Sequence, residues 1–149
     1  MPTVNSTFIL QVADYLAWET KLGTGQKPIT VFIVDDQQEI RKALRELLDL
    51  ERDIRVIGEA GNGTDAIHPM LRKLVPDVIL MDVRMPGING IEATTRLREV
   101  GLRSKVVVLT QFREYLPQAM RAGADAALNK MESLDRGGLA SIIRMVVQR

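Results

Sequence analysis

Five polar residues lie where apolar, β-rich runs of the sequence end, and their types could support one kind of chemistry. Asp35 and Asp36 come directly after the first run, and Asp82, Thr110 and Lys130 end three later runs. Three carboxylates gathered at one place repel one another unless a cation neutralises them, and oxygen ligands suit Mg²⁺. A lysine and a hydroxyl facing that cluster could hold the oxygens of a transferred phosphoryl group. The set therefore predicts a magnesium site that accepts phosphate on Asp82.

Each of these residues also has an ordinary structural interpretation. Asp35 and Asp36 could cap the helix that follows, because aspartate is a favoured N-cap residue. Asp82 stands shortly before a Pro-Gly turn and could belong to the chemistry of that turn. Neither interpretation explains why all of these residues recur at the ends of successive runs. We therefore favour the metal and phosphoryl interpretation for the set as a whole.

The composition of the chain removes most other kinds of site. Cysteine is absent, which excludes disulfides, thiol catalysis, thiolate metal sites and iron–sulfur clusters. The single histidine, His68, makes a histidine metal cluster or a serine-type triad hard to build. Lys and Arg number 20 against 19 Asp and Glu, so no bulk charge draws the chain to nucleic acid or to a membrane. We expect no direct nucleic-acid binding, no membrane association and no independent enzyme activity.

The elements that must position these residues alternate along the chain, whose 149 residues are the length of one ordinary domain. Because parallel strands need helical crossovers, alternating β-rich and helix-periodic segments predict an α/β fold in which helices cover both faces of a parallel sheet. Functional groups in such sheets gather at the carboxyl ends of the strands. We expect strands at 29–34, 54–60, 77–82, 105–110 and 125–130, and helices at about 40–51, 64–75, 91–100, 116–122 and 139–147.

The first 28 residues are interpreted as an extension rather than as part of the domain at 29–149. Apolar residues between 7 and 22 recur at helical spacing, and the segment 23–28 resembles a linker. This helix could pack on the domain, form a homodimer contact, or bind another chain. The start has no basic region typical of a signal peptide, and no run approaches the ~18 apolar residues that span a bilayer. We therefore expect a cytoplasmic protein.

The ordered set of site residues resembles the receiver domain of two-component response regulators, the CheY-like superfamily. The resemblance rests on Asp35 and Asp36 after the run 31–34, on the run 82–87, on Thr110 and on Lys130, and it covers about 29–148. The run 81–93 is similar to the NarL/LuxR-type subgroup, which usually carries a C-terminal helix-turn-helix. The resemblance implies a doubly wound, flavodoxin-like sheet of five strands in the order 2-1-3-4-5, with five flanking helices.

The resemblance also implies a role for each matched acidic residue. Asp82 would be the phosphoacceptor. Asp36, with Asp35 acting through water, would complete the protein part of a Mg²⁺ shell together with Asp82 and the backbone carbonyl of Arg84. The phosphoryl group would come from the phosphohistidine of a sensor histidine kinase, from a phosphotransfer protein or from a small phosphodonor.

Thr110 and Lys130 would bind the phosphoryl group, and Pro86 and Gly87 would shape the turn after the phosphorylated strand. The chain departs from the family at Ala127, a position that is commonly Tyr or Phe and whose ring is thought to swing inward on activation. The segment between Thr110 and the next Gly turn is also short and contains a proline, so we expect a short or late-starting fourth helix. The residues that the family uses to accept the phosphoryl group are therefore all present. The positions that respond to phosphorylation in the family differ in this chain.

Three functions therefore stay open. The first is a receiver that signals through a protein partner or a homodimer after phosphorylation, which agrees with a nearly neutral charge. The second is the receiver portion of a LuxR-type DNA-binding transcriptional regulator whose helix-turn-helix is absent from this chain, because the sequence ends soon after the last expected helix. The third is a phosphorylation-independent interaction module, motivated by Ala127 and the shortened helix.

Overall fold

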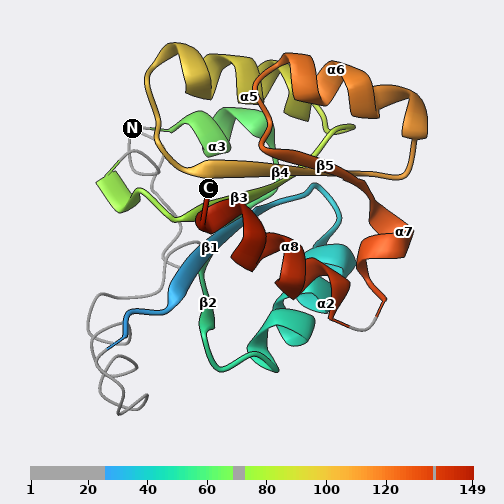
Figure 1. Ribbon diagram of the computed structural model, residues 1–149. Coiled ribbons are helices and arrows are strands. Elements are labelled where there is room, and N and C mark those ends of the chain that lie inside the picture. The colour runs from blue at the N-terminus through green and yellow to red at the C-terminus, as the bar shows by residue number, and fades with distance from the viewer. Residues whose placement is uncertain (1–25, 69–72, 136) are drawn as a thin grey trace.

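A five-stranded parallel sheet lies between two layers of helices in the computed structural model, which describes residues 26–68, 73–135 and 137–149 (Figure 1). The strand order is β2-β1-β3-β4-β5, and each neighbouring pair is parallel. This confirms the expected doubly wound fold. The strands are β1 (Ile29–Val34), β2 (Ile54–Ala60), β3 (Val78–Asp82), β4 (Lys105–Thr110) and β5 (Ala126–Asn129).

Helices cover both faces of the sheet, with α3, α5 and α6 on one face and α2 and α8 on the other (Figure 1). The described residues contain six α-helices and a 3₁₀ helix, and none of these helices combines the length and apolar character needed to cross a membrane. Their bounds are α2 (Gln38–Asp49), α3 (Gly63–Ile67), α5 (Gly90–Glu99), η2 (Arg113–Tyr115), α6 (Leu116–Arg121), α7 (Lys130–Ser133) and α8 (Gly138–Val147).

Two separate apolar cores hold the layers together. Neighbouring side chains of a strand point to opposite faces, so Val31 and Ile33 pack toward α2 and α8 while Phe32 and Val34 pack toward α3, α5 and α6. Every residue of β3 is buried, as expected for a central parallel strand covered on both sides. The polar residues that end such strands therefore lie on a rigid edge.

The predicted fifth strand is too long at both ends. Lys130 does not end that strand but is the first residue of α7, a short helix that the periodicity did not predict. The cause is Asn129, whose side chain accepts hydrogen bonds from the backbone N–H groups of Met131 and Glu132 and so caps α7. At the other end, the Asp125 carboxylate accepts a hydrogen bond from Val106 N at 2.8 Å, and β5 begins only at the next residue.

The helix before β5 is short and begins late, as predicted. The 3₁₀ turn η2 precedes it, and α6 has six residues. Pro117 lies in the first turn of α6, where its missing N–H group would have no helical partner in any case. The helix expected at about 64–75 appears as α3, which ends at Ile67, and residues 69–72 lie outside the described part of the chain. The predicted helix over 7–22 also lies outside it.

Arg98 ties the end of α5 to the turn between α6 and β5. Its guanidinium donates to the carbonyl oxygens of Gly123 at 2.9 Å, Leu102 at 3.1 Å and Ser104 at 2.8 Å, and to Asp125 Oδ2 at 2.6 Å. A planar group with five N–H donors suits such a set of acceptors. The carboxyl end of α6 is therefore fixed to the body of the domain.

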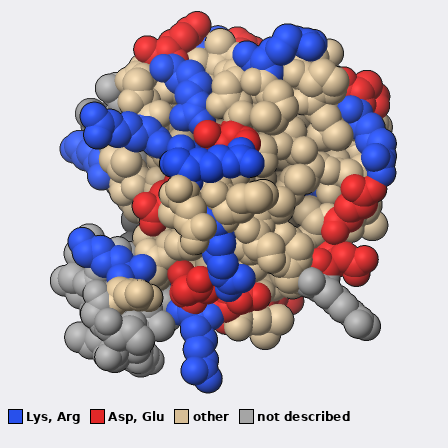
Figure 2. All heavy atoms as spheres, in the orientation of Figure 1, with Lys and Arg blue, Asp and Glu red and all other residues tan. Residues whose placement is uncertain are grey.

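Charged side chains of both signs are interspersed over the face seen in Figure 2. Two arginines in the C-terminal part of the chain are paired with carboxylates. Arg144 on α8 donates to Glu51 Oε2 at 2.5 Å and to Asp53 Oδ1 at 2.8 Å, and Arg113 on η2 forms an ion pair with Glu132 on α7. These pairs join charges of opposite sign on the surface.

Candidate functional site

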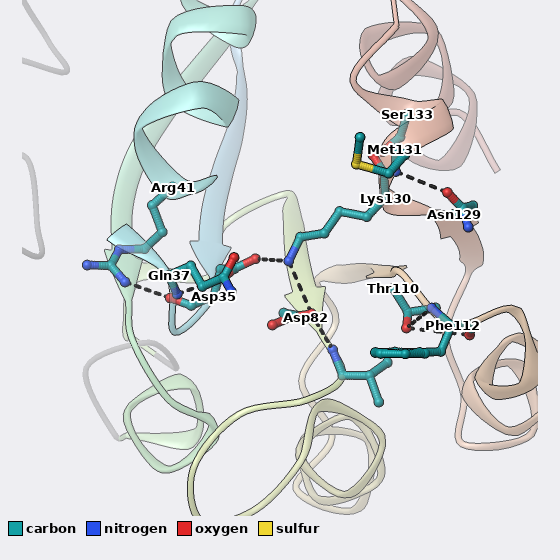
Figure 3. A network of polar contacts seen from close by, with 11 residues as sticks. Asp35, Gln37, Arg41, Asp82, Thr110, Phe112, Asn129, Lys130, Met131 and Ser133 are labelled. Carbon is teal, nitrogen blue, oxygen red and sulfur yellow. Dashed lines mark hydrogen bonds and ion pairs between the residues drawn. The ribbon is translucent and has the colours of Figure 1, made fainter. Parts of the chain in front are cut away.

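The five predicted site residues meet at the carboxyl edge of the sheet, where Figure 3 shows all of them but Asp36. Asp35 and Asp36 follow β1, Asp82 ends β3, Thr110 ends β4, and Lys130 follows β5. Because all five strands run in the same direction, residues far apart in the sequence share this edge. Four of the five, all but Asp35, help to line a cavity of about 190 Å³, whose lining residues are Asp36, Gln37, Asp82, Arg84, Thr110, Gln111, Phe112 and Lys130.

Three carboxylates lie close enough together to share a cation. Asp35, Asp36 and Asp82 each offer an oxygen atom, and these atoms all lie within 4.8 Å of one another. Asp35 and Asp82 are buried, whereas Asp36 is exposed to solvent. Oxygen-only donors with access for water match the preference of Mg²⁺. The residues present therefore fit a hard divalent cation.

The helix-capping interpretation of the first two aspartates is wrong. The N-cap residue of α2 is Gln37, and its side chain makes no capping hydrogen bond. Asp35 Oδ1 instead accepts a hydrogen bond from Gln37 N at 2.9 Å, and the Asp35 carbonyl accepts one from Arg41 at 2.6 Å. These contacts hold the Asp35 backbone and one carboxylate oxygen, which leaves the other oxygen directed at Lys130.

Lys130 is a buried cation between two buried carboxylates. Its ammonium group forms an ion pair with Asp35, and its Nζ lies 3.3 Å from Asp82 Oδ1 (Figure 3). The side chain of Lys130 is 3% exposed. A charge so far from water is stable only when it is paired, and here two acidic groups supply the pairing.

The two carboxylate oxygens of Asp82 differ in the hydrogen bonds that they accept. Oδ1 accepts a hydrogen bond from Val83 N at 3.0 Å and also faces Lys130. Within the described ranges, no residue donates a hydrogen bond to Oδ2. Burial and, after it, the negative charge of Asp35 raise the pKa of Asp82 from 3.8 to about 6. The surroundings of this carboxylate thus disfavour its ionised form.

We expect the Asp82→Asn variant to be more stable than the wild type at neutral pH. The pKa of Asp82 is about 6 in the folded chain and near 3.8 when unfolded, so its ionised form destabilises the fold. The gain should be roughly 1–3 kcal/mol in the free energy of unfolding. It should be complete above about pH 6 and should disappear as the pH falls toward 3.8, because the folded wild type then takes up the proton. Urea unfolding across this pH range measures it.

A matched control is Asp49→Asn, because Asp49 is an exposed carboxylate at the end of α2. This variant should change the free energy of unfolding by at most about 0.5 kcal/mol at every pH. Equal stability of wild type and Asp82→Asn at neutral pH would contradict the burial argument. A stability gain of Asp82→Asn over wild type that grows as the pH falls would contradict it as well.

The loop after β3 depends on two glycines. Gly87 has a φ of 78°, a left-handed conformation that favours glycine, and it follows Pro86 in the turn. Gly90 begins α5, and its N–H donates to the Val83 carbonyl at 2.8 Å. A Cβ atom at Gly90 would lie 1.8 Å from the backbone oxygen of Asp82. The close approach of α5 to the end of β3 therefore requires glycine at this position.

Ala127 lies on β5 opposite Val108, and it packs against the core on the α3, α5 and α6 side of the sheet. Phe112, which the sequence analysis did not single out, lies in the cavity wall two residues after Thr110. A signal was available, because aromatic residues make up only 4% of the chain and this one stands close to a predicted strand end.

Comparisons with known proteins agree with this arrangement. Residues 31–142 match the family model described as the response regulator receiver domain. The chain is 43% identical over 122 residues to the uncharacterized transcriptional regulatory protein YvfU of Bacillus subtilis, covering 80% of this chain and 60% of that protein. It is 38% identical over 109 residues to the nitrate/nitrite response regulator NarL of Escherichia coli, covering 72% and 50%. The chain thus spans about half to three-fifths of these relatives.

Solved structures show the same fold. The receiver domain of the putative response regulator NarL from Mycobacterium tuberculosis superposes with a TM-score of 0.74 at 26% identity, covering 83% of this chain and 100% of that one. The response regulator domain of Thermotoga maritima CheB gives 0.74 at 28% identity, covering 83% and 98%. With the family model matching most of the sequence, the chain belongs to the response regulator receiver domain family of two-component systems, with relatives of the NarL/LuxR type.

Proposed function

We propose that the chain is a signalling receiver that accepts a phosphoryl group on Asp82 in a Mg²⁺-dependent reaction. The observation that carries this proposal is the Asp82 carboxylate itself, which borders an open cavity between a second buried aspartate and a buried lysine. The donor would be the phosphohistidine of a sensor histidine kinase or a phosphotransfer protein. The role of the chain is then to carry a signal rather than to turn over a substrate.

The chain's own residues divide the work of the transfer. Asp82 Oδ2 attacks phosphorus, the bond from phosphorus to the donor nitrogen breaks, and the donor imidazole keeps the electron pair and takes a proton from water. Lys130, released in part from Asp82 Oδ1, donates to a phosphoryl oxygen, and the Thr110 hydroxyl donates to another. A bound Mg²⁺, held by Asp35, Asp36, Asp82 and the Arg84 carbonyl, would neutralise the negative charge gathered there.

Intact mass measurement tests this function. Wild-type protein incubated with a small phosphodonor and Mg²⁺ should gain the mass of one phosphoryl group, and chelation of Mg²⁺ should prevent the gain. The Asp82→Asn variant should gain nothing, because the attacking oxygen is gone. The exposed-site control Asp49→Asn should gain the group like the wild type. No gain in the wild type, or the same gain in Asp82→Asn, would overturn the proposal.

A second candidate is that these residues are the receiver portion of a longer DNA-binding regulator. It is favoured by the relatives, several of which are named as transcriptional regulatory proteins. The chain spans 60% and 58% of the lengths of two of them. In that case the domain at 29–149 would control an output module rather than a separate partner or a homodimer. The reading frame beyond codon 149 tests this, and a helix-turn-helix encoded there would support it.

A third candidate, an interaction module independent of phosphorylation, is motivated by Ala127. It would hold if the mass experiment succeeds but phosphorylation changes neither oligomeric state nor conformation. The cytoplasm, where sensor kinases present their phosphohistidine, is the compartment that the proposed function requires.

A further inference from the structure

Arg41 on α2 binds the backbone of the acidic site, although it does not line the cavity. Its Nη1 donates a hydrogen bond to the Asp35 carbonyl at 2.6 Å, and in Figure 3 Arg41 and Lys130 lie on opposite sides of Asp35. The side chain of Arg41 is 14% exposed. A guanidinium with so little access to water is stable only when acidic or polar groups pair with it. The contacts that supply this pairing therefore also determine how Arg41 meets Asp35.

Glu59 on β2 supplies the pairing. Arg41 Nε donates to Glu59 Oε1 at 3.2 Å, and Arg45 Nη2, one turn further along α2, donates to Glu59 Oε2 at 2.8 Å. Burial alone would raise the pKa of Glu59, but the hydrogen bonds from Arg45 and Arg41 outweigh burial, so the pKa is lowered. Glu59 is therefore ionised at neutral pH, and each of its carboxylate oxygens is bound to one arginine.

The direction of the Arg41 guanidinium is fixed because the group is rigid and planar. While Nε is bound to Glu59, Nη1 cannot turn away from the Asp35 carbonyl. A Cβ atom at Gly61 would lie 3.5 Å from the same Nη1, so this nitrogen also lies against the turn that follows β2. The hydrogen bond to Asp35 is therefore set by the end of β2.

The Asp35 carbonyl belongs to the same planar peptide group as the Asp36 N–H. Asp35 N donates to the Ala60 carbonyl at 3.0 Å, so β2 holds the peptide before Asp35 directly and the peptide after it through Arg41. In the part of the chain that the structure describes, no donor binds the Asp36 carboxylate, so its direction depends on the backbone that carries it. Both aspartates thus project from a backbone that Arg41 holds in place.

We propose that Arg41 is a positioning residue for the cation site, because it holds the peptide between Asp35 and Asp36 in the orientation that brings their carboxylates to one cation. The proposal rests on the proposed Mg²⁺-dependent function and adds residues of α2 and β2 to that site. Glu59 contributes by fixing Arg41. Arg45 contacts the same Glu59 from the next turn of α2, which makes it the matched control for a merely structural role.

Titration of the full, unphosphorylated chain with MgCl₂, followed by the shifts of its backbone amide signals in NMR spectra, tests this role. The Arg41→Met variant should bind Mg²⁺ roughly 10-fold or more weakly than the wild type, as expected when a partner behind metal ligands is lost. The Arg45→Met variant also loses an ion pair with Glu59 but keeps the hydrogen bond to Asp35. It should bind Mg²⁺ like the wild type. The dispersion of the same spectra shows whether each variant is folded.

A second pair of variants keeps the charge beside Glu59, so that the fold is retained even if Arg41→Met does not fold. In Arg41→Lys, a single nitrogen cannot lie at both the Nε and the Nη1 positions, so the ammonium pairs with Glu59 and the Asp35 carbonyl loses its donor. This variant should bind Mg²⁺ more weakly than Arg45→Lys, whose one nitrogen replaces the single contact that Arg45 makes with Glu59.

The outcomes separate this inference from the proposed function. Equal Mg²⁺ affinities of the Arg41 and Arg45 variants would overturn the positioning role of Arg41 alone, because the proposed function requires only the aspartates, Thr110 and Lys130. Weaker binding in both arginine variants would also overturn it, since the effect would then follow the loss of ion pairs with Glu59. A wild type that binds no Mg²⁺ would overturn the cation site of the proposed function, and the role of Arg41 with it.

Discussion

Replacement of Lys130 by methionine is expected to lower the free energy of unfolding by about 3–5 kcal/mol at neutral pH. Lys130 is buried between Asp35 and Asp82, and methionine fills much of the same space without the charge. Two buried carboxylates would then face each other with no cation between them. Urea unfolding of both proteins, without divalent ions, measures the loss.

The matched control is Lys42→Met, which removes an exposed lysine on α2 whose Nζ lies 4.0 Å from Glu46. That variant should lose at most about 0.5 kcal/mol, as surface ion pairs do. Added Mg²⁺ should recover part of the loss in Lys130→Met, because a cation among the three aspartates replaces the missing charge. The buried-pair argument fails if the two lysine variants are equally stable.

Replacement of Gly90 by alanine is the second change with a large expected effect. The added Cβ would lie 1.8 Å from the Asp82 backbone oxygen and 2.9 Å from Met81 Cγ. Since the nearest atom belongs to the backbone of a buried central strand, the clash is relieved only if α5 moves away from β3. We expect a loss of about 3 kcal/mol or more in the free energy of unfolding. Phosphorylation should also become slower, because the loop that joins the phosphoacceptor residue to α5 must shift with the helix.

Gly138→Ala is a suitable control because Gly138 is also the first residue of a helix. A Cβ atom there would meet nothing within 4 Å, and the position is exposed. Alanine is the better helix former, so this variant should be unchanged or up to about 1 kcal/mol more stable. Thermal unfolding of both variants gives the comparison, and similar midpoints for the two would contradict the requirement for glycine at the start of α5.

The sequence alone was sufficient for the fold and for the convergence of the site residues. Continuous apolar runs separated by helix-periodic segments permit little other than a parallel sheet, and its geometry brings the ends of the strands to one edge. Asp82 and Thr110 could therefore be placed together, because each is the last residue of a strand. These strands are β3, which starts at Val78, and β4, which starts at Lys105. The composition helped, because the absence of cysteine left carboxylate chemistry as the main option.

The details that the sequence did not show depend on side chains that accept hydrogen bonds where a backbone carbonyl would otherwise accept them. Asn129 caps α7 with its side chain, so that Lys130 reaches the site from a helix instead of a strand. Asp77 begins no strand because its carboxylate accepts hydrogen bonds from Thr30 N and Oγ1. The contacts of Phe112 depend on the packing of its ring against Tyr115 and beside the Arg84 guanidinium. Hydrophobic periodicity carries no information about such contacts.

The two ends of α6 are attached to the domain in different ways. Near its carboxyl end, the Gly123 carbonyl and the Asp125 carboxylate are bound by the Arg98 guanidinium. At its amino end, η2 and the Phe112 ring form the connection to the site. A short helix held more firmly at its carboxyl end would pivot about that end rather than slide as a unit. Any displacement of α6 would then be largest at its amino end.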